Sequence, residues 1–453
     1  MRKANERGGH PGRDVRTLVA AAATRREEYP DHSPVGHTAE VDSPCGLAVT
    51  DLVRRGMRGV GIALVAKALI VTAILLSFYL STDFGNVFNL WNRWYTGSGD
   101  LASWYIPFSN WDGQYYLLLS DWGYNYAGTP DSSHAFFPLY PMLIRVLSLV
   151  LPRMAAAGLL SVLTTAGFCY FLFLTGHLLG CRSPHLAVLV TLSFPTAFYA
   201  SVFYTEGLFL FLQLGFVYHY LFTRSRMAWL FAALLPLTRG TALFVAAGVF
   251  AHMLLGYFKS LREASRSSRS SPDKGTRSAR KLASISFDWN YHAHCLAAFV
   301  VGGLAYLAFF GVATGDPFAG FAGQDTFAVN SISNLLNPGH FLAYLRSEST
   351  TWFGARDNLF DKMFVIAAML GSVVFLVYKD WRLLCFYVPL VYGQAAMGIG
   401  VSFPRFWLVA VPYLGLVLAR NVNQRWIVYA ACAAMLGLQL FLLHKFSLNL
   451  WIA

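Results

Sequence analysis

The chain has 453 residues, of which 56% are hydrophobic and only 13% are charged. Soluble domains carry about 25% charged residues, so a water-soluble chain of this composition could not cover its own surface. A net charge of +12 would suggest a nucleic-acid partner in a soluble protein, but the chain has no basic, aromatic-interleaved domain. The composition therefore excludes a soluble globular protein, argues against nucleic-acid binding and favours a membrane protein.

The N-terminal residues form a polar tail of mixed charge that is rich in Gly, Pro, Ser and Arg. The tail has no hydrophobic periodicity, so we expect it to be disordered. The apolar run at 59–80 lacks the small-residue cleavage site of a signal peptide, so we expect it to remain as a membrane span. We therefore divide the chain into a disordered tail, 1–57, and a transmembrane domain, 58–453.

Further apolar runs recur along the rest of the chain, and a helix needs about 20 such residues to cross a bilayer. They lie at 155–179, 185–202, 204–222, 227–237, 241–258, 292–313, 360–378, 383–401, 406–419 and 426–444. Together with 59–80, these runs predict an all-α polytopic membrane protein of about eleven transmembrane helices, a few of them short.

The connections between these runs orient the chain, because cytoplasmic loops are enriched in Lys and Arg. If the basic end of the tail lies in the cytoplasm and the chain crosses the membrane at each predicted run in turn, every basic connection falls on the cytoplasmic side, including the long loop 259–290. This threading requires the segment 227–258 to fold back near Arg239. The fold-back also keeps Arg239 out of mid-bilayer, where a lone Arg costs at least about 2.5 kcal/mol. We therefore predict a cytoplasmic N-terminus.

Two long connections then face away from the cytoplasm, at 81–156 and 314–359. The first is rich in Trp and Tyr, as segments at a membrane interface are. Its end, 139–151, is apolar but too short to span, so we expect a helix that lies in the interface.

The same threading brings a set of polar side chains to the outer face. They are Asp112, Asp121 and His134 in the first loop, Tyr204 and Glu206 in a tight turn, Arg239 at the fold-back, Asp316, Gln324 and Asp325 in the second loop, and Arg405 in another turn. Carboxylates, a histidine and two arginines on one face are suited to acid–base chemistry on an anionic, lipid-borne substrate.

Each of the charged residues also has a structural interpretation. Asp112 could cap the helix that we expect at 113–120, and Glu206 could complement the positive N-terminus of a helix. Arg239 and Arg405 could reach lipid headgroups, although two arginines in tight outer turns, each beside Gly or Pro, favour a phosphate clamp.

His134 and Trp111, whose side chains are aromatic, have structural interpretations as well. His134 beside an apolar stretch is more often structural than catalytic. Trp111 belongs to an aromatic group with Trp104 and Tyr105 that is typical of interfacial anchoring, although sugars also stack on such rings.

Three stretches of the first outer loop resemble the PIG-V family of mannosyltransferases. They are WDGQYY at 111–116, GY at 123–124 and HAFFPLYP at 134–141, against a family pattern of W-D-x-x-x-Y/F, G-Y and A-F-F-P-x-x-P. Weaker matches are FYTEGLF at 203–209, LTRG at 237–240 and PRF at 404–406. The resemblance runs from about residue 59 to the C-terminus, apart from the basic loop.

This resemblance implies a GT-C type glycosyltransferase. Such enzymes move a sugar from a polyprenyl-phosphate donor, such as dolichyl-phosphate-mannose or a bacterial equivalent, to a glycolipid or glycan acceptor on the extracytoplasmic or lumenal face. The essential acidic residue of the first outer loop would be Asp112. The residues that we expect to bind substrate are Trp111, Tyr116, His134, Tyr204, Glu206, Arg239 and Arg405.

The sequence gives no reason to expect a metal or another cofactor. The six cysteines have no CxxC spacing and mostly lie in or beside apolar runs, so we predict neither a disulfide framework nor a zinc site. Gln114-Tyr115 replaces the His/Tyr variants common in the eukaryotic members, which leaves the acceptor open.

A polytopic transporter or lipid flippase is the main alternative. Transporters tend to have inverted repeats and charged sites near the midplane, whereas this chain has no internal repeat and its polar residues gather at one face. A non-catalytic scaffold would not need them there. No retention signal is visible, so we expect a prokaryotic plasma membrane, with the endoplasmic reticulum membrane as the alternative.

Overall fold

A computed structural model describes residues 49–80, 104–125, 131–270, 288–326, 335, 337–349, 351–353, 358–397, 402–450 and 452. The chain divides into two units, Met1–Asp42 and Ser43–Ala453, and every described residue belongs to the second. Most of the predicted disordered tail, parts of both outer loops and much of the basic loop therefore lie outside the described residues.

The described residues contain helices and turns but no strand, which confirms the all-α prediction. The α-helices are α2 (Val49–Tyr79), α4 (Asp112–Trp122), α5 (Leu139–Leu147), α6 (Arg153–Leu178), α7 (Pro184–Ser193), α8 (Glu206–Tyr218), α9 (Met227–Leu234), α10 (Ala242–Ser270), α12 (Trp289–Thr314), α13 (Ala319–Thr326), α14 (Pro338–Arg346), α15 (Leu359–Tyr378), α16 (Trp381–Met397), α17 (Phe403–Trp407), α18 (Val411–Asn421) and α19 (Arg425–Ser447). Short 3₁₀ or π turns are η2 (Ile106–Phe108), η3 (Asp131–Ala135), η4 (Ala197–Ser201), η5 (His219–Thr223) and η6 (Leu235–Leu237).

Six helices in the described part of the chain are long and apolar enough to cross a membrane. They are Thr50–Tyr79, Arg153–Leu178, Ala242–Glu263, Trp289–Thr314, Leu359–Tyr378 and Arg425–Ser447. Each contains one of the predicted apolar runs or differs from it by a residue at one end. This supports a multi-pass membrane protein.

The other five predicted runs form shorter or interrupted helices among the described residues, and a proline explains where one of them ends. The run at 185–202 ends as a helix at Ser193, two residues before Pro195, because a residue that precedes proline avoids the helical region. The run at 383–401 keeps Pro389 inside α16, and the run at 406–419 is split between α17 and α18, near Pro412. The count of about eleven spans stays a prediction.

The predicted fold-back at Arg239 coincides with a break between helices. α9 ends at Leu234, η6 follows it to Leu237 with Pro236 inside, and α10 begins at Ala242. α12 packs against both α9 and α10. The segment 227–258 is therefore not one continuous helix, and Arg239 lies in the break.

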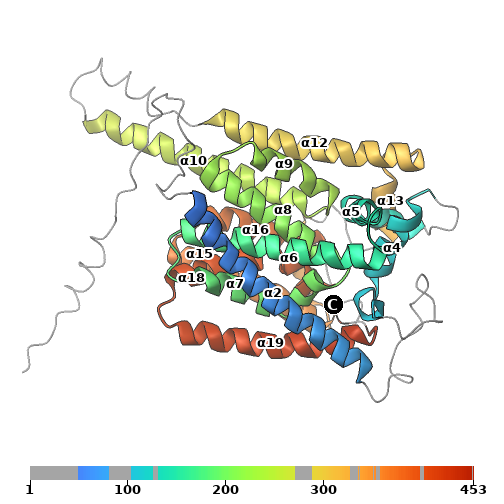
Figure 1. The fold of residues 1–453 in the computed structure, drawn as a ribbon. Coiled ribbons are helices and arrows are strands. Elements are labelled where there is room, and N and C mark those ends of the chain that lie inside the picture. The colour runs from blue at the N-terminus through green and yellow to red at the C-terminus, as the bar shows by residue number, and fades with distance from the viewer. Residues whose placement is uncertain are drawn as a thin grey trace, which may run out of the picture. The chain divides into compact units, whose positions relative to one another are not determined.

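Packing centres on α6, which contacts α2 along one side and α8 along another (Figure 1). α10 packs on α16, and α7 packs on α18. The short helices α4 and α5 gather near one end of α6, together with η3 and α13 (Figure 1). α4, which carries Asp112 and Tyr116, therefore lies near one end of α6 (Figure 1).

α5 is the helix that we expected to lie in the membrane interface. It spans only Leu139–Leu147 and buries Tyr140, Pro141 and Ile144 against the protein. Val146, Leu149 and Val150, on its last turn and just beyond it, leave 59%, 81% and 81% of their surfaces exposed. Exposed apolar side chains of this kind are typical of a helix that lies in a membrane interface. They support the predicted interfacial position of α5, which stays a prediction.

The close approach of α12 to α9 depends on one glycine. A Cβ at Gly302 would lie 2.1 Å from the backbone oxygen of Ala233, whereas a Cβ at the neighbouring Gly303 would have no atom within 4 Å. We expect Gly302→Ala to lower the free energy of unfolding by about 1–3 kcal/mol, because the helices must move apart.

Gly303→Ala is the matched control. It should be neutral or slightly stabilising, because Ala is favoured over Gly in a helix by up to about 1 kcal/mol. Thermal unfolding of the two variants in the same detergent compares them, and equal shifts would contradict the predicted close packing.

Candidate functional site

Asp112 is the first residue of α4, and its carboxylate faces Arg405. The N-cap position belongs to Trp111, and no side chain makes a capping hydrogen bond there. The alternative that Asp112 serves as the helix cap is therefore wrong. Instead, Arg405 Nη1 donates to Asp112 Oδ2 at 2.6 Å, and 29% of the Asp112 side chain remains exposed.

The backbone on either side of Asp112 is tied to the rest of the protein. The backbone N–H of Asp112 donates to Tyr204 Oη at 3.1 Å, and the same hydroxyl donates to the carbonyl of Asn110 at 2.9 Å. Asn110 Nδ2 in turn donates to the carbonyl of Phe446 at 2.6 Å. Tyr204 therefore fixes the start of α4 relative to α8.

Trp111 has a backbone conformation that L-residues seldom adopt. Its φ is +53° and its ψ is −119°. A non-glycine residue in this region costs on the order of 1–3 kcal/mol, and such residues concentrate at functional sites. This residue directly precedes Asp112, the first residue of the helix.

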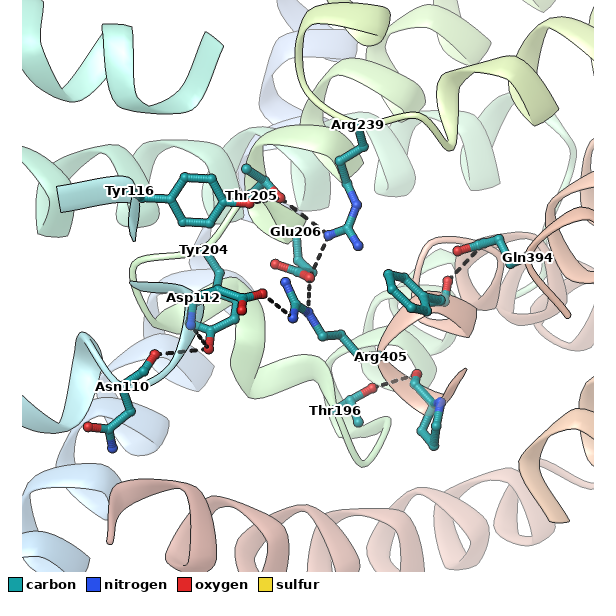
Figure 2. Close-up of polar contacts among 12 residues, drawn as sticks. Asn110, Asp112, Tyr116, Thr196, Tyr204, Thr205, Glu206, Arg239, Gln394 and Arg405 are labelled. Atoms are coloured by element: carbon teal, nitrogen blue, oxygen red, sulfur yellow. Dashed lines mark hydrogen bonds and ion pairs between the residues drawn. The ribbon is translucent and has the colours of Figure 1, made fainter. Parts of the chain in front are cut away.

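Glu206 occupies the centre of the site. Its side chain is fully buried, and its Oε1 accepts hydrogen bonds from Arg239 Nη1 at 2.5 Å and from Arg405 Nε. Figure 2 shows the carboxylate between the two guanidinium groups. The other oxygen, Oε2, is buried and has no hydrogen-bond partner within the part of the chain that the structure describes.

These contacts join four residues into one chain of ion pairs, in the order Asp112, Arg405, Glu206 and Arg239 (Figure 2). We call this set the ion-pair network. Two carboxylates face two guanidinium groups, so its formal charge is zero. The members come from four separate segments of the sequence, and only tertiary folding brings them together.

Aromatic rings enclose the guanidinium groups. The Arg405 guanidinium carbon lies 4.5 Å from the centre of the Tyr204 ring and 5.1 Å from that of Tyr199, and the Arg239 guanidinium carbon lies 5.3 Å from that of Phe406. Cations are attracted to ring faces, more strongly where water is excluded. Burial lowers the pKa of Arg405, but the neighbouring carboxylates outweigh it and raise that pKa well above its usual value, so Arg405 stays charged.

Tyr116 borders the network from α4. Its hydroxyl lies 3.4 Å from Thr205 Oγ1, which also accepts a hydrogen bond from Arg239 Nη1 at 3.3 Å. Burial and the nearby carboxylates raise the pKa of Tyr116 well above its usual value. The phenol therefore keeps its proton and is available as a hydrogen-bond donor.

Arg405 belongs to the five-residue helix α17, which other segments hold at both ends. Thr196 Oγ1 donates to the carbonyl of Pro404 at 2.8 Å, and Gln394 Nε2 donates to the carbonyl of Phe406 at 3.0 Å (Figure 2). A helix this short cannot hold its own geometry, so these bonds determine where the guanidinium group lies.

The structure brings most of the predicted site residues together. Asp112, Tyr204, Glu206, Arg239 and Arg405 contact one another directly. Tyr116 touches the network through Thr205, and Trp111 precedes Asp112 in sequence.

His134 is the exception among the predicted site residues. Its Nε2 lies 3.1 Å from the carbonyl oxygen of Tyr124, and its ring packs on Tyr124 and Phe310. It lies in η3, against which α13 packs. These contacts favour the structural interpretation of His134.

The other polar residues that we predicted to face outward make local contacts. Asp121 pairs with Arg153, Asp316 Oδ1 accepts from the backbone of Phe318 at 2.9 Å, and Gln324 Nε2 donates to the carbonyl of Ala135 at 2.5 Å. The side chain of Asp325 lies outside the described residues.

Several residues around the network were not predicted. Tyr199, Thr196, Thr205 and Gln394 are uncharged residues inside apolar runs, and nothing in their spacing distinguishes them. Lys67 is different, because a lysine inside the apolar run 59–80 can be recognised in the sequence as an unusual charged residue within a predicted span.

Within the described residues, no group of three or more His, Cys, Asp or Glu side chains could hold a metal ion. The cysteines among those residues are free. The two carboxylates of the network are engaged by arginine.

Residues 100–270 match the family model described as mannosyltransferase (PIG-V). The range includes Asp112, Glu206 and Arg239, while Arg405 lies beyond it. No curated protein matches the chain. Within this range, the family match confirms the resemblance predicted from the motifs, and it supports a mannosyltransferase.

Glu206 should matter more to stability than Asp112. Removing one partner from a buried ion pair costs about 3–5 kcal/mol, because the remaining charge is left uncompensated. We therefore expect Glu206→Gln to lower the free energy of unfolding by about this amount. The isosteric Asp112→Asn, at a partly exposed position, should cause a smaller loss.

Thermal or denaturant unfolding in detergent measures both variants. An equal loss in the two would contradict the greater contribution predicted for Glu206.

Proposed function

We propose that this chain, whose residues 100–270 match the mannosyltransferase (PIG-V) family, transfers mannose from a polyprenyl-phosphate donor to a hydroxyl group of a glycolipid or glycan acceptor. The observation that carries the proposal is the ion-pair network, in which the partly exposed carboxylate of Asp112 pairs with Arg405, and the buried Glu206 joins Arg405 to Arg239. A reaction of this type needs a base for the attacking hydroxyl and positive charge for the leaving phosphate.

Asp112 is the proposed general base. It is the more exposed of the two carboxylates, with 29% of its side chain accessible against 0% for Glu206. Asp112 accepts the proton of the acceptor hydroxyl while that oxygen forms a bond to the anomeric carbon of the donor. The bond from this carbon to the phosphate oxygen breaks, and the lipid phosphate leaves with the electron pair.

Arg405 and Arg239 are the proposed partners of the phosphate. The contacts described above engage Nε and Nη1 of Arg405 but only Nη1 of Arg239. Each arginine therefore keeps N–H groups that can donate to a phosphate oxygen, and such charge-assisted bonds are among the strongest in proteins. The lipid phosphate is the leaving group and leaves as an anion. Its negative charge therefore needs to be stabilised by these donors more than it needs a proton from a general acid.

Glu206 has a different proposed role from Asp112. Because it is fully buried and holds both arginines, it orients the phosphate partners. Its Oε2 is a buried acceptor without a partner among the described residues, and such atoms usually meet a ligand or water. We propose that a hydroxyl group of the acceptor substrate donates a hydrogen bond to Oε2.

The remaining predicted residues have smaller proposed parts. The ring of Trp111 offers a surface for a sugar, and the protonated phenol of Tyr116 offers a donor. His134 is left out of the proposed chemistry, because its contacts lie with Tyr124 and Phe310.

The proposed location is the extracytoplasmic face of a membrane, in a GT-C type arrangement. Arg239 lies just before α10, whereas Lys259, Arg262 and Arg266 lie near the end of the same helix, across its apolar part. Basic helix ends favour the cytoplasm. The network should therefore face the opposite side, where lipid-linked sugars are used. A prokaryotic plasma membrane remains the proposed host.

Asp112→Asn tests the base. We expect kcat to fall by about 10²–10⁴, because the amide cannot accept the proton, while the variant keeps its fold. Purified protein with a polyprenyl-phosphate-mannose donor, and product identification by mass spectrometry, give the measurement. Full turnover in this variant would show that Asp112 is not the general base. If the wild-type protein returned the donor lipid unchanged, the result would point to a transporter or flippase.

Arg405→Gln tests the phosphate clamp. We expect weaker binding of the donor and of the free lipid phosphate, by about tenfold or more, because a charge-assisted hydrogen bond contributes roughly 1.5–3 kcal/mol. Arg145→Gln on α5 is the matched control and should change neither affinity. Unchanged donor affinity in Arg405→Gln, with the fold intact, would make Arg405 a headgroup anchor instead.

A further inference from the structure

Lys67 is a buried lysine inside α2, one of the helices long enough to cross a membrane. Only 6% of its surface is exposed. The proposed reaction does not use it. Ionisable residues within a span are costly to bury, so they are rare and usually have a function.

The ammonium group of Lys67 contacts only neutral oxygens. Its Nζ donates to Ser161 Oγ at 2.6 Å, to Ala200 O at 2.8 Å and to Thr165 Oγ1 and Ser161 O at 3.1 Å each. An ammonium group has three N–H donors, and here it faces four acceptors. No donor is left for a ligand, so Lys67 is not an anion-binding site.

The carbonyl of Ala200 is the point on which these bonds converge. Ser161 Oγ and Thr165 Oγ1 also donate to it, each at 3.0 Å. Ala200 belongs to η4, the irregular turn after α7. Backbone groups outside a regular helix must find partners within the protein at membrane depth, and α2 and α6 provide them here.

The opposite side of η4 reaches the ion-pair network. The Tyr199 ring lies 5.1 Å from the Arg405 guanidinium carbon, and Thr196, just before η4, donates to the carbonyl of Pro404 at 2.8 Å. The chain then continues from η4 to Glu206 within five residues. One short turn therefore connects the Lys67 contacts with two members of the network.

We propose that Lys67 is a positioning residue that holds η4 in place, so that Tyr199 and Glu206 keep Arg405 oriented for the phosphate. The role in catalysis rests on the proposed function, while the effect on η4 does not. Replacing a buried charge by an apolar residue of similar volume is often neutral or stabilising, so the melting temperature alone does not reveal a positioning role. Local exchange in η4 and kcat are the measurements that do.

Lys67→Met separates these roles, because Met has a similar length and no donor. Hydrogen–deuterium exchange of a peptide covering 194–207 should increase in this variant, with the melting temperature unchanged or raised. kcat should fall about tenfold to a hundredfold, as small displacements from a remote change can cause, with a smaller change in the KM for the donor.

The control is Lys362→Met. Lys362 is also buried, at 5% exposed, but its Nζ donates to Ser347, at 2.9 Å from Ser347 Oγ, and not to η4. Exchange of 194–207 should not change in this control. Lys67→Gln, whose amide retains two donors, should give an intermediate increase, and it replaces Lys67→Met if that variant does not fold.

Two results would overturn the proposal. One is unchanged exchange in 194–207 for Lys67→Met, whatever the activity. The other is increased exchange with wild-type kcat. If the wild-type chain transfers no sugar, the proposed function fails separately, and the exchange experiment alone decides whether Lys67 holds η4.

Discussion

The fully buried carboxylate of Glu206 is the constraint on which the site depends. A carboxylate cannot remain ionised away from water unless it is paired and hydrogen-bonded. Two guanidinium groups provide that pairing, and they come from the helix break before α10 and from the short helix α17. The positions of both segments are therefore coupled to the start of α8, and the helix break and α17 are parts of one electrostatic unit.

The two carboxylates of the network differ in environment, and the different roles that we propose for them follow from this difference. Glu206 is enclosed and shares one oxygen between two arginines, whereas Asp112 makes a single ion pair and remains partly open. Pairs of similar acids in unlike surroundings commonly divide the work of an active site. In the proposed mechanism, the buried Glu206 orients the two arginines, and the more open Asp112 takes the proton of the attacking hydroxyl.

The sequence was informative where one dominant physical effect decides the outcome. Long apolar runs predict the six long helices, and the cost of a charge in lipid predicts that Glu206 and Arg405 gather at one face. The shorter elements depend on competing effects, as at Pro195, where the helix ends inside an apolar run. The contacts of Lys67 and the neighbours of His134 depend on packing between distant segments, which local pattern does not encode.

The network also has an order of assembly along the chain. Arg239 follows Glu206 by 33 residues, whereas Arg405 follows it by 199. A ribosome feeding this protein into a membrane therefore delivers Glu206 together with its first partner, and these two charges can neutralise each other early. Arg405 emerges only after α15 and α16 have been made, so Asp112 acquires its partner late. The ion-pair network therefore cannot be complete until Arg405 has been synthesised, and a nascent chain that ends before this residue lacks one of its members.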